Sequence, residues 1–262
     1  MIYLTGDTHC YFKRFTKKER MKMQFEIKAD DYVMICGDFG LLWAKDKEFQ
    51  YNLEWLSGLP FTILWVQGNH ENYNMIEEYQ LEMWNGGKVR HIARDKIILL
   101  ERGQVFNVEG NTFFTFGGAS SHDISGGILD RKSSDFAEQK KKIHKSGLSY
   151  RIRNESWWEQ ELPSEDELME GLSNLSKVNY QVDFIISHCM SNTMQEKLVQ
   201  CITGGHSSLL MPQDVLTDYF EMLEGKLNFK HWFCGHYHEP MELDSKHTIL
   251  YKNVVKLEEY CK

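Results

Sequence analysis

The sequence predicts an α/β fold with two β-sheets and a group of polar side chains gathered at one sheet edge. Three observations support this prediction. Short apolar runs alternate with helical stretches along most of the chain, potential metal ligands follow five of these runs, and the middle of the chain is rich in strand-like segments. Apolar runs of this length, with almost no polar position, are typical of strands buried on both faces.

The overall composition is that of an ordinary globular protein. The chain has 262 residues, of which 42% are apolar and 26% charged, so it can bury a sizeable core. We expect a single domain spanning residues 1–262. The longest apolar runs fall far short of the roughly 18 residues that cross a bilayer, and the first residues lack the pattern of a secretory signal. A cytoplasmic protein without a membrane partner is therefore expected.

Charge and cysteine content narrow the possible ligands. The formal net charge is −8, which disfavours binding to long nucleic acids because neutralising phosphates needs an excess of Lys and Arg. The six cysteines include no C-x-x-C pair, so free thiols are expected rather than disulfides or a cysteine zinc site. A small or short phosphorylated ligand is compatible with this composition.

Three strand ends recur at a constant interval in the first third of the chain. The apolar runs 2–5, 32–36 and 61–67 lie just before Asp7, Asp38 and Asn69, and both intervals between these residues are 31 residues. That is about the length of one strand–helix–strand unit. Helices are expected between the runs, at about 12–28 and 45–57, and a third is expected from 72 to before 86.

Two further runs near the C-terminus have the same organisation. The run 184–186 precedes His188, and the run 229–234 precedes His236 and His238. In sheets of parallel strands, ligands collect at the carboxyl ends of the strands. All five polar clusters are therefore expected to converge on one edge.

The middle of the chain has a different pattern. The segments 97–100, 104–108 and 112–116 are expected to form an antiparallel meander in the second sheet. The following polar stretch shows no clear period, and we expect a long loop insertion at about 118–163. Ser164 and Glu167 form a capping box that predicts a helix to about 177, and another helix is expected over 211–224.

Seven side chains in the five clusters offer oxygen or nitrogen ligands, namely Asp7, His9, Asp38, Asn69, His188, His236 and His238. This mixed set is too large for one ion and suggests two transition metal ions that share Asp38 as a bridge. Paired ions lie about 3.5 to 4 Å apart, clamp a phosphoryl group and lower the pKa of a bound water, so that hydroxide exists near neutral pH. The pattern therefore predicts hydrolysis of a phosphate ester.

The five clusters resemble the motifs of the calcineurin-like metallophosphoesterases. That family has D-x-H, G-D, G-N-H-[ED], a lone H and G-H-x-H, and all five occur here in this order between residues 7 and 238. The resemblance implies an αββα sandwich of two facing mixed β-sheets flanked by helices, with the metal site at the C-terminal ends of the strands. It also implies two divalent transition metal ions, manganese first, with iron, zinc or nickel as alternatives.

The resemblance also assigns roles to individual residues. One metal would be held by Asp7, His9, Asp38 and His238, and the other by Asp38, Asn69, His188 and His236. His70 resembles the catalytic histidine of the family, which donates a proton to the leaving oxygen or contacts the phosphate. Cys10 stands where glycine is common, and its place beside the metals predicts activity that is sensitive to oxidation.

The substrate is less well defined than the metal site. Residues 37–43 lack the Asp and Arg of the G-D-x-x-D-R-G motif that the family's protein phosphatases carry, so protein phosphatase activity is not expected. A phosphodiester is slightly preferred, because a histidine acid matters most when the leaving oxygen is basic. A phosphomonoester phosphatase is the alternative. A non-catalytic metal-binding scaffold is a third hypothesis, although it would not need the complete ligand set and His70.

Three residues of the expected insertion are candidates for substrate contacts. Arg131 can hold a phosphate with two hydrogen bonds, and Trp157 can stack on a base or a sugar. The alternative for Trp157 and Trp158 is that both anchor the loop to the core. His122 and His206 lie in loops rich in glycine and serine that can reach the site.

Overall fold

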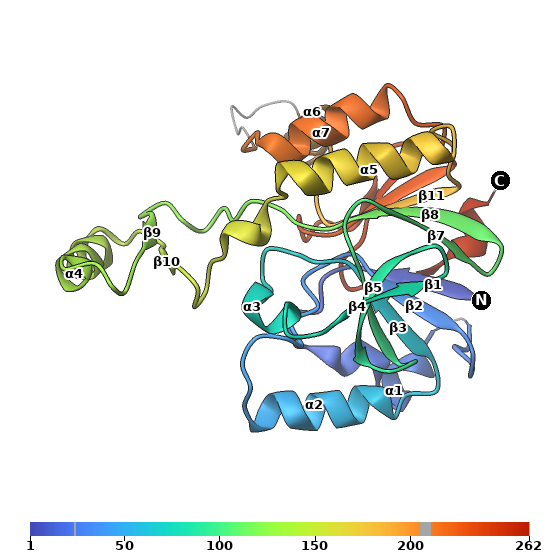
Figure 1. Cartoon of the computed structure of the whole chain (residues 1–262), viewed down its shortest axis with the longest axis horizontal. Helices are drawn as coiled ribbons and strands as arrows, with labels where there is room; N and C mark the ends of the chain where they lie inside the picture. The colour runs from blue at the N-terminus through green and yellow to red at the C-terminus, as the bar shows by residue number, and fades with distance from the viewer. Residues whose placement is uncertain (24, 205–210, 262) are drawn as a thin grey trace.

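The computed structural model describes residues 1–23, 25–204 and 211–261. Two mixed β-sheets face each other, and helices cover the outer face of each sheet (Figure 1). The predicted αββα sandwich is therefore confirmed. His206 lies outside the described residues.

Sheet I has seven strands, in the order β15 (Val254–Lys256), β1 (Ile2–Thr5), β2 (Tyr32–Ile35), β3 (Thr62–Trp65), β6 (Ile97–Leu100), β5 (Gly87–Ala93) and β4 (Leu81–Trp84). Strands β1, β2, β3 and β6 run parallel to one another. In contrast, β15 and β5 run antiparallel to their neighbours.

Sheet II has six strands, in the order β13 (Met241–Glu242), β14 (His247–Ile249), β12 (His231–Cys234), β11 (Phe184–Ser187), β8 (Asn111–Phe116) and β7 (Gln104–Val108). Its four central strands are parallel, and β13 and β7 are antiparallel at the two edges. Each of the five polar clusters follows β1, β2, β3, β11 or β12, so parallel pairing within each sheet brings them to the same edge.

Helices pack on both outer faces. Helices α1 (Lys17–Arg20) and α2 (Lys47–Ser57) lie on sheet I, whereas α5 (Glu165–Lys177), α6 (Asn192–Thr203) and α7 (Val215–Glu224) lie on sheet II (Figure 1). The α5 helix begins with the predicted capping box, in which the Ser164 side chain and Glu167 each bond to the other's backbone. Short 3₁₀ turns occur at Phe12–Phe15, Glu159–Glu161 and Leu257–Tyr260.

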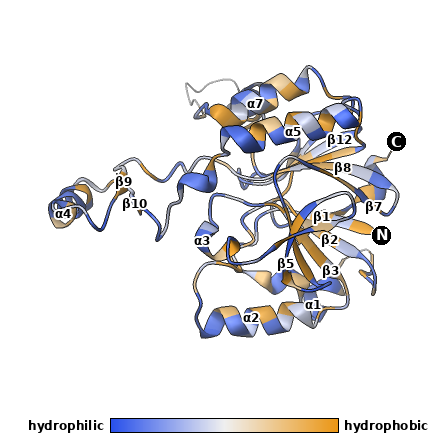
Figure 2. Ribbon diagram, in the orientation of Figure 1, coloured by the Kyte–Doolittle hydropathy of each residue, from blue (hydrophilic) through white to orange (hydrophobic). Residues whose placement is uncertain are grey.

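Successive side chains of a strand pack into two different layers of the core. In β3, Leu64 packs in the core between the two sheets, whereas Ile63 and Trp65 pack with Leu56 of α2 on the other face. Successive side chains of a strand point to opposite faces, so a strand between two packed layers must be apolar at every position. Figure 2 shows the resulting hydrophobic strands inside and more polar helices outside.

Two of the predicted helices are wrong in extent. The described residues of 12–28, which exclude residue 24, contain a 3₁₀ turn and the single turn α1, and Thr16 caps the start of α1 by accepting from the Glu19 amide. The helix predicted from 72 is only the single turn α3 (Tyr73–Ile76). It is followed by a β4–β5 hairpin around Asn85 and Gly86, which both have positive φ, the Asn-Gly signature of a tight hairpin.

The predicted meander is wrong in one strand. β6 was expected in the second sheet with β7 and β8, but it pairs parallel to β3 and belongs to sheet I. All four of its residues are buried. A fully apolar strand fits equally well between layers in either sheet, and its pairing partner is decided by contacts distant in sequence.

The segment expected as a loop insertion contains regular structure. It projects from the sandwich and carries α4 (Phe136–Ser146) at its tip, with β9 (Ile128–Leu129) and β10 (Arg151–Ile152) paired in parallel at its middle (Figure 1). We call residues 118–163 the extension.

Within the described residues, none of the helices combines the length and apolarity that crossing a bilayer requires.

Candidate metal centre

The five loops after the strands bring their polar side chains together, as the sequence predicts. Four of the predicted ligands have a left-handed backbone although none is glycine, with φ of 45° at His9, 47° at Asp38, 67° at His236 and 58° at His238. Such conformations cost free energy and cluster at functional sites, where the surrounding contacts hold them. The loops are thus shaped to aim these side chains.

The first group of ligands surrounds Asp7. Nε2 of His238 lies 2.9 Å from Oδ2 of Asp7 and 2.9 Å from Nε2 of His9. Nε2 of His9 is 3.7 Å from Oδ2 of both Asp7 and Asp38. Metal–ligand bonds of about 2.1 Å place neighbouring ligand atoms roughly 3.0 to 3.4 Å apart. The spacing of this group therefore fits the coordination shell of one ion.

The second group lies on the other side of Asp38. Nε2 of His188 is 3.3 Å from Oδ1 of Asp38 and 3.2 Å from Oδ1 of Asn69. The His236 ring lies against His188, with the ring centroids 5.0 Å apart. Asp38 thus directs one oxygen to each group. A shared carboxylate between two sets of nitrogen and oxygen donors fits two divalent ions.

Buried partners orient two of the second-group ligands. Nδ1 of His188 lies 2.7 Å from the Cys36 carbonyl oxygen, so it carries a proton and turns Nε2 toward Asp38 and Asn69. The amide nitrogen of Asn69 donates to Oγ of Ser121 at 3.3 Å, and Ser121 donates to Oε2 of Glu161 at 2.6 Å. This chain turns the amide oxygen of Asn69 toward His188. Burial raises the pKa of Glu161 to about 8.

Two motif positions must be glycine because aspartate side chains lie directly against their backbone. A Cβ at Gly68 would lie 2.0 Å from Oδ1 of Asp38, and one at Gly235 would lie 2.2 Å from Oδ1 of Asp7. These distances leave no room for any side chain. The amides of His70 and His236 then donate to Asp38 and Asp7 at 2.8 and 3.0 Å.

The histidines of the cluster have strongly shifted pKa values. Burial alone would lower the pKa of His188, but the adjacent Asp38 carboxylate outweighs it and raises that pKa to about 9. Burial and the neighbouring His188 lower the pKa of His236 well below its usual range. Burial likewise lowers the pKa of His9. His9 and His236 therefore offer neutral imidazole nitrogens, and a bound cation would replace the proton of His188.

His70 lies beside the first group and meets a charged pair from the extension. Its ring centroid is 5.0 Å from that of His9. Nη2 of Arg151 approaches its Nε2 at 2.8 Å, and Asp123 binds Arg151 from the other side. Burial lowers the pKa of His70 to about 4. The resting imidazole is therefore neutral.

Sequence reasoning missed the charged residues that support the site. Arg14 binds the carbonyl oxygens of Gly6 and Asp7 at 3.0 and 2.6 Å and so holds the first loop. Glu71 is fully buried and accepts from the Phe39 amide at 2.7 Å, which holds the Asp38 loop. Glu71 belongs to the G-N-H-[ED] motif, so the sequence could have indicated it. Arg151 and Asp123 lie in the stretch without a clear period, where no sequence pattern indicates them.

The three candidate substrate contacts lie in different places. His122 is near the cluster, its ring centroid 5.4 Å from that of His236. Arg131 is exposed, pairs with Glu155 and lies over the Phe136 ring, all within the extension. Trp157 is half-buried and packs against Arg153 of the extension. Trp158 is fully buried in the core and contacts Trp43, as an anchor would.

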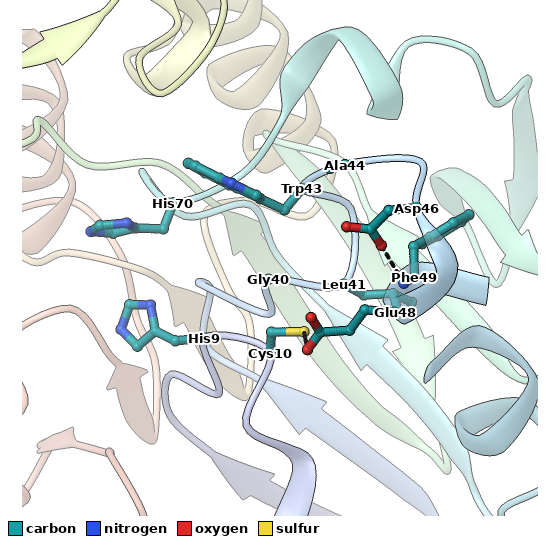
Figure 3. Close-up of a pocket in the computed structure, with 10 residues that line it drawn as sticks. All are labelled: His9, Cys10, Gly40, Leu41, Trp43, Ala44, Asp46, Glu48, Phe49 and His70. Atoms are coloured by element: carbon teal, nitrogen blue, oxygen red, sulfur yellow. Dashed lines mark hydrogen bonds between the residues drawn. The ribbon is translucent and has the colours of Figure 1, made fainter. Parts of the chain in front are cut away.

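Two pockets flank the proposed metal ligands. The first has a volume of about 280 Å³, begins at His9 and His70, and is walled by Leu41, Trp43 and Phe49 (Figure 3). Its other lining residues are Cys10, Gly40, Ala44, Asp46 and Glu48. The second, of about 450 Å³, begins at His236 and His238; its lining includes Ser120, His122 and Gln195.

Cys10 lies in the wall of the first pocket. Its Sγ is 3.3 Å from the Asn52 amide nitrogen and 3.8 Å from a Glu48 oxygen, which it faces in Figure 3. Burial, with the Glu48 carboxylate next in importance, raises the pKa of the Cys10 thiol. Since the thiolate is the form that reacts with oxidants, this environment opposes the predicted sensitivity to oxidation.

Comparison with known proteins identifies the family of the chain. The model of the calcineurin-like phosphoesterase family matches residues 1–240. No curated protein shows significant sequence similarity to the chain. Among solved structures, the chain is similar to the phosphopantetheinyl hydrolase (PptH) from Mycobacterium tuberculosis, with a TM-score of 0.43 and 13% identity over 95% of this chain and 87% of that one. Since the family model spans nearly the whole sequence, the protein belongs to the calcineurin-like phosphoesterase family of metal-dependent hydrolases.

Proposed function

We propose that this protein hydrolyses a phosphodiester with two small organic groups and that it works with two divalent metal ions. The observation that carries the proposal is the position of Asp38. Its two carboxylate oxygens face separate groups of donors, 3.3 Å from His188 and 3.7 Å from His9. A buried carboxylate shared in this way suits two cations held close together, and it is costly to bury without them.

The side chains present divide into two ligand sets. One ion is held by Asp7, His9, Asp38 and His238, and the other by Asp38, Asn69, His188 and His236. Imidazole nitrogens with carboxylate and amide oxygens suit manganese, iron, zinc or nickel, and we place manganese first. When bound, such a pair of ions neutralises phosphoryl oxygens and lowers the pKa of a water molecule.

His70 is proposed to act on the leaving group. It stands with His9 at the mouth of the first pocket, so an ester oxygen whose organic group enters that pocket comes next to its ring (Figure 3). The neutral ring donates a hydrogen bond to that oxygen. After it has taken up a proton, the imidazolium can pass one to an oxygen that leaves as a strong base and so returns to neutral imidazole.

The two flanking pockets favour a diester over a monoester. A phosphoryl group at the metal ligands has the first pocket on its His9 and His70 side and the second on its His236 and His238 side. A diester places one organic group in each pocket. A monoester would use only one of them, and it is the second candidate.

The organic groups that these pockets suit are small. A volume of about 280 Å³ with Trp43 and Phe49 in its wall accommodates a group such as an aromatic ring or a sugar. The carboxylates of Asp46 and Glu48 line the same pocket and disfavour a second negative charge there.

We also propose that the enzyme is cytoplasmic, which the six free cysteines support.

A panel of matched esters tests the proposal. Metal-free protein is supplied separately with manganese, iron, zinc, nickel or magnesium and assayed on bis(p-nitrophenyl) phosphate and p-nitrophenyl phosphate, which share one leaving group. The proposal expects a higher kcat/KM for the diester. Trp43→Ala should raise KM for that diester, with exposed Tyr51→Ala as the control. Preference for the monoester would favour the phosphatase, and no turnover of any ester with any metal would favour the non-catalytic scaffold.

A further inference from the structure

We propose that Arg151, held by Asp123, is a positioning residue for His70, so that the extension is a working part of the active site. The inference rests on the proposed function, because it assigns a task to His70 in that reaction. It concerns the base of the extension, where β10 and residues 121–123 approach the loop after β3.

The Arg151 side chain is buried, with 5% exposure, although it comes from a projecting segment. Its Nε lies 2.6 Å from Oδ1 of Asp123, and its Nη2 lies 3.1 Å from Oδ2 of the same carboxylate. This two-pronged contact is the geometry that holds a guanidinium most rigidly. Asp123 is therefore the anchor of Arg151.

The rest of the guanidinium faces the loop of the proposed catalytic histidine. Nη1 donates to the carbonyl oxygens of Asn69 and Ser156 at 3.3 and 3.1 Å. Nη2 lies 2.8 Å from Nε2 and 3.1 Å from Nδ1 of His70. One fork thus contacts both the backbone before His70 and the ring itself.

These contacts define what Arg151 can do. A guanidinium has only donors, so it can bond to His70 only where a ring nitrogen carries no proton. It therefore holds the ring in one orientation, with Nη2 next to the ring edge that carries both nitrogens. Because all three guanidinium nitrogens already have partners, Arg151 acts through His70 rather than as a free phosphate ligand.

The neighbouring loop offers no replacement for this pair. The residues after Asp38 are Phe39, Gly40, Leu41, Leu42 and Trp43, and none carries a charge. Arg151 also faces the buried carboxyl of Glu161, whose Oε1 lies 3.6 Å from Nη1. Glu161 also bonds to Ser121, which orients Asn69. The base of the extension thus supports two successive residues of one motif.

A double-mutant cycle on the full-length enzyme separates positioning from a direct role. The variants are Arg151→Met, His70→Gln and the pair. Arg153→Met is the matched control, since Arg153 is two residues further on, is 42% exposed and contacts Glu159 and Trp157 instead. Losing an outer-shell partner of this kind costs roughly 10- to 100-fold in activity.

We expect Arg151→Met to lower kcat by that factor on an alkyl-leaving diester, with little change in KM or metal content. Arg151→Lys should recover part of the loss, and Arg153→Met should match wild type. In the His70→Gln background, Arg151→Met should cost almost nothing more, because its effect passes through His70. An equal loss in both backgrounds would overturn the inference.

A spectroscopic readout keeps the test independent of turnover. In ¹⁵N spectra of the imidazoles, with His70 assigned by its loss in His70→Gln, the wild type should show one set of His70 shifts, as expected for a ring held in one orientation. Arg151→Met and Asp123→Asn should give averaged shifts, and Arg153→Met should not. Unchanged His70 shifts in Arg151→Met would overturn the inference. An inactive wild type with the expected shifts would overturn the proposed function alone.

Discussion

Oδ1 of Asp38 lies 3.3 Å from Nε2 of His188, and both side chains are almost completely inaccessible to solvent. The carboxylate raises the pKa of the histidine above its usual value although burial opposes it, and the histidine holds the pKa of Asp38 well below its usual range although burial opposes that too. Without metal, the pair is a buried ion pair. In the proposed metal-bound form, both side chains are ligands.

The bridging role of Asp38 is tested by Asp38→Asn. The substitution keeps the size of the side chain but removes the charge that lets two cations sit close together. Metal content per chain, measured by elemental analysis, should fall well below two. Exposed Asp130→Asn should keep the wild-type content. Two full equivalents together with normal turnover in Asp38→Asn would refute the bridge.

Metal-free protein should lose stability between pH 6.5 and pH 9 through His188. The folded-state pKa of about 9 lies above the unfolded value of 6.5, so this contribution is complete below pH 6.5 and is lost as the pH rises through 9. A shift of this size corresponds to about 3 kcal/mol. Thermal unfolding of EDTA-treated wild type and His188→Gln at both pH values measures it.

The loss should be absent from His188→Gln and much reduced in metal-loaded wild type. A bound cation replaces the proton on His188, and metal affinity rises with pH because ligand protons are released. The same pH dependence in both metal-free proteins would show that other groups cause it.

His70→Gln should distinguish a proton donor from a phosphate ligand. General acid catalysis is worth roughly 10² to 10⁴ in rate, and only leaving oxygens that need a proton lose it. Turnover of alkyl or nucleoside diesters should therefore fall far more than turnover of p-nitrophenyl diesters. Both metals should stay bound, and exposed His144→Gln should behave as wild type. Equal losses on the two kinds of ester would point to phosphate binding instead.

The adjacent Trp157 and Trp158 should respond differently to alanine. Trp158 is fully buried, and losing a buried Trp costs roughly 3 to 5 kcal/mol of unfolding free energy. Half-buried Trp157→Ala should lower stability much less. Arg131→Ala should leave stability near wild type, since Arg131 and Glu155 form a surface ion pair. KM should stay near wild type in both. A KM raised several-fold in either variant would show that the residue reaches substrate.

Most of the fold could be predicted from local sequence patterns. The strands β1, β2 and β3 were visible because burial on both faces requires an apolar residue at every position, and the α5 start was visible because a capping box is completed within four residues. The hairpin of β4 and β5 was missed although its signal, Asn85 followed by Gly86, is local too. The helix expected from residue 72 extended over the first strand of this hairpin, Leu81–Trp84.

The ligands of the candidate metal centre could be named from the sequence because each follows a strand, and the direction of parallel strands determines where their ends meet. The residues that support His70 could not be named from the sequence. Arg151 lies 81 residues from His70 in a stretch without periodicity, and Asp123 lies 28 residues from Arg151. Their meeting depends on the path of the extension back to the loop after β3. The layers, and the strand ends at which the proposed metal ligands meet, could be predicted from the sequence because they follow from short-range patterns. Only the tertiary structure decided the sheet of β6 and the partner of the proposed catalytic histidine, because both depend on contacts between distant parts of the chain.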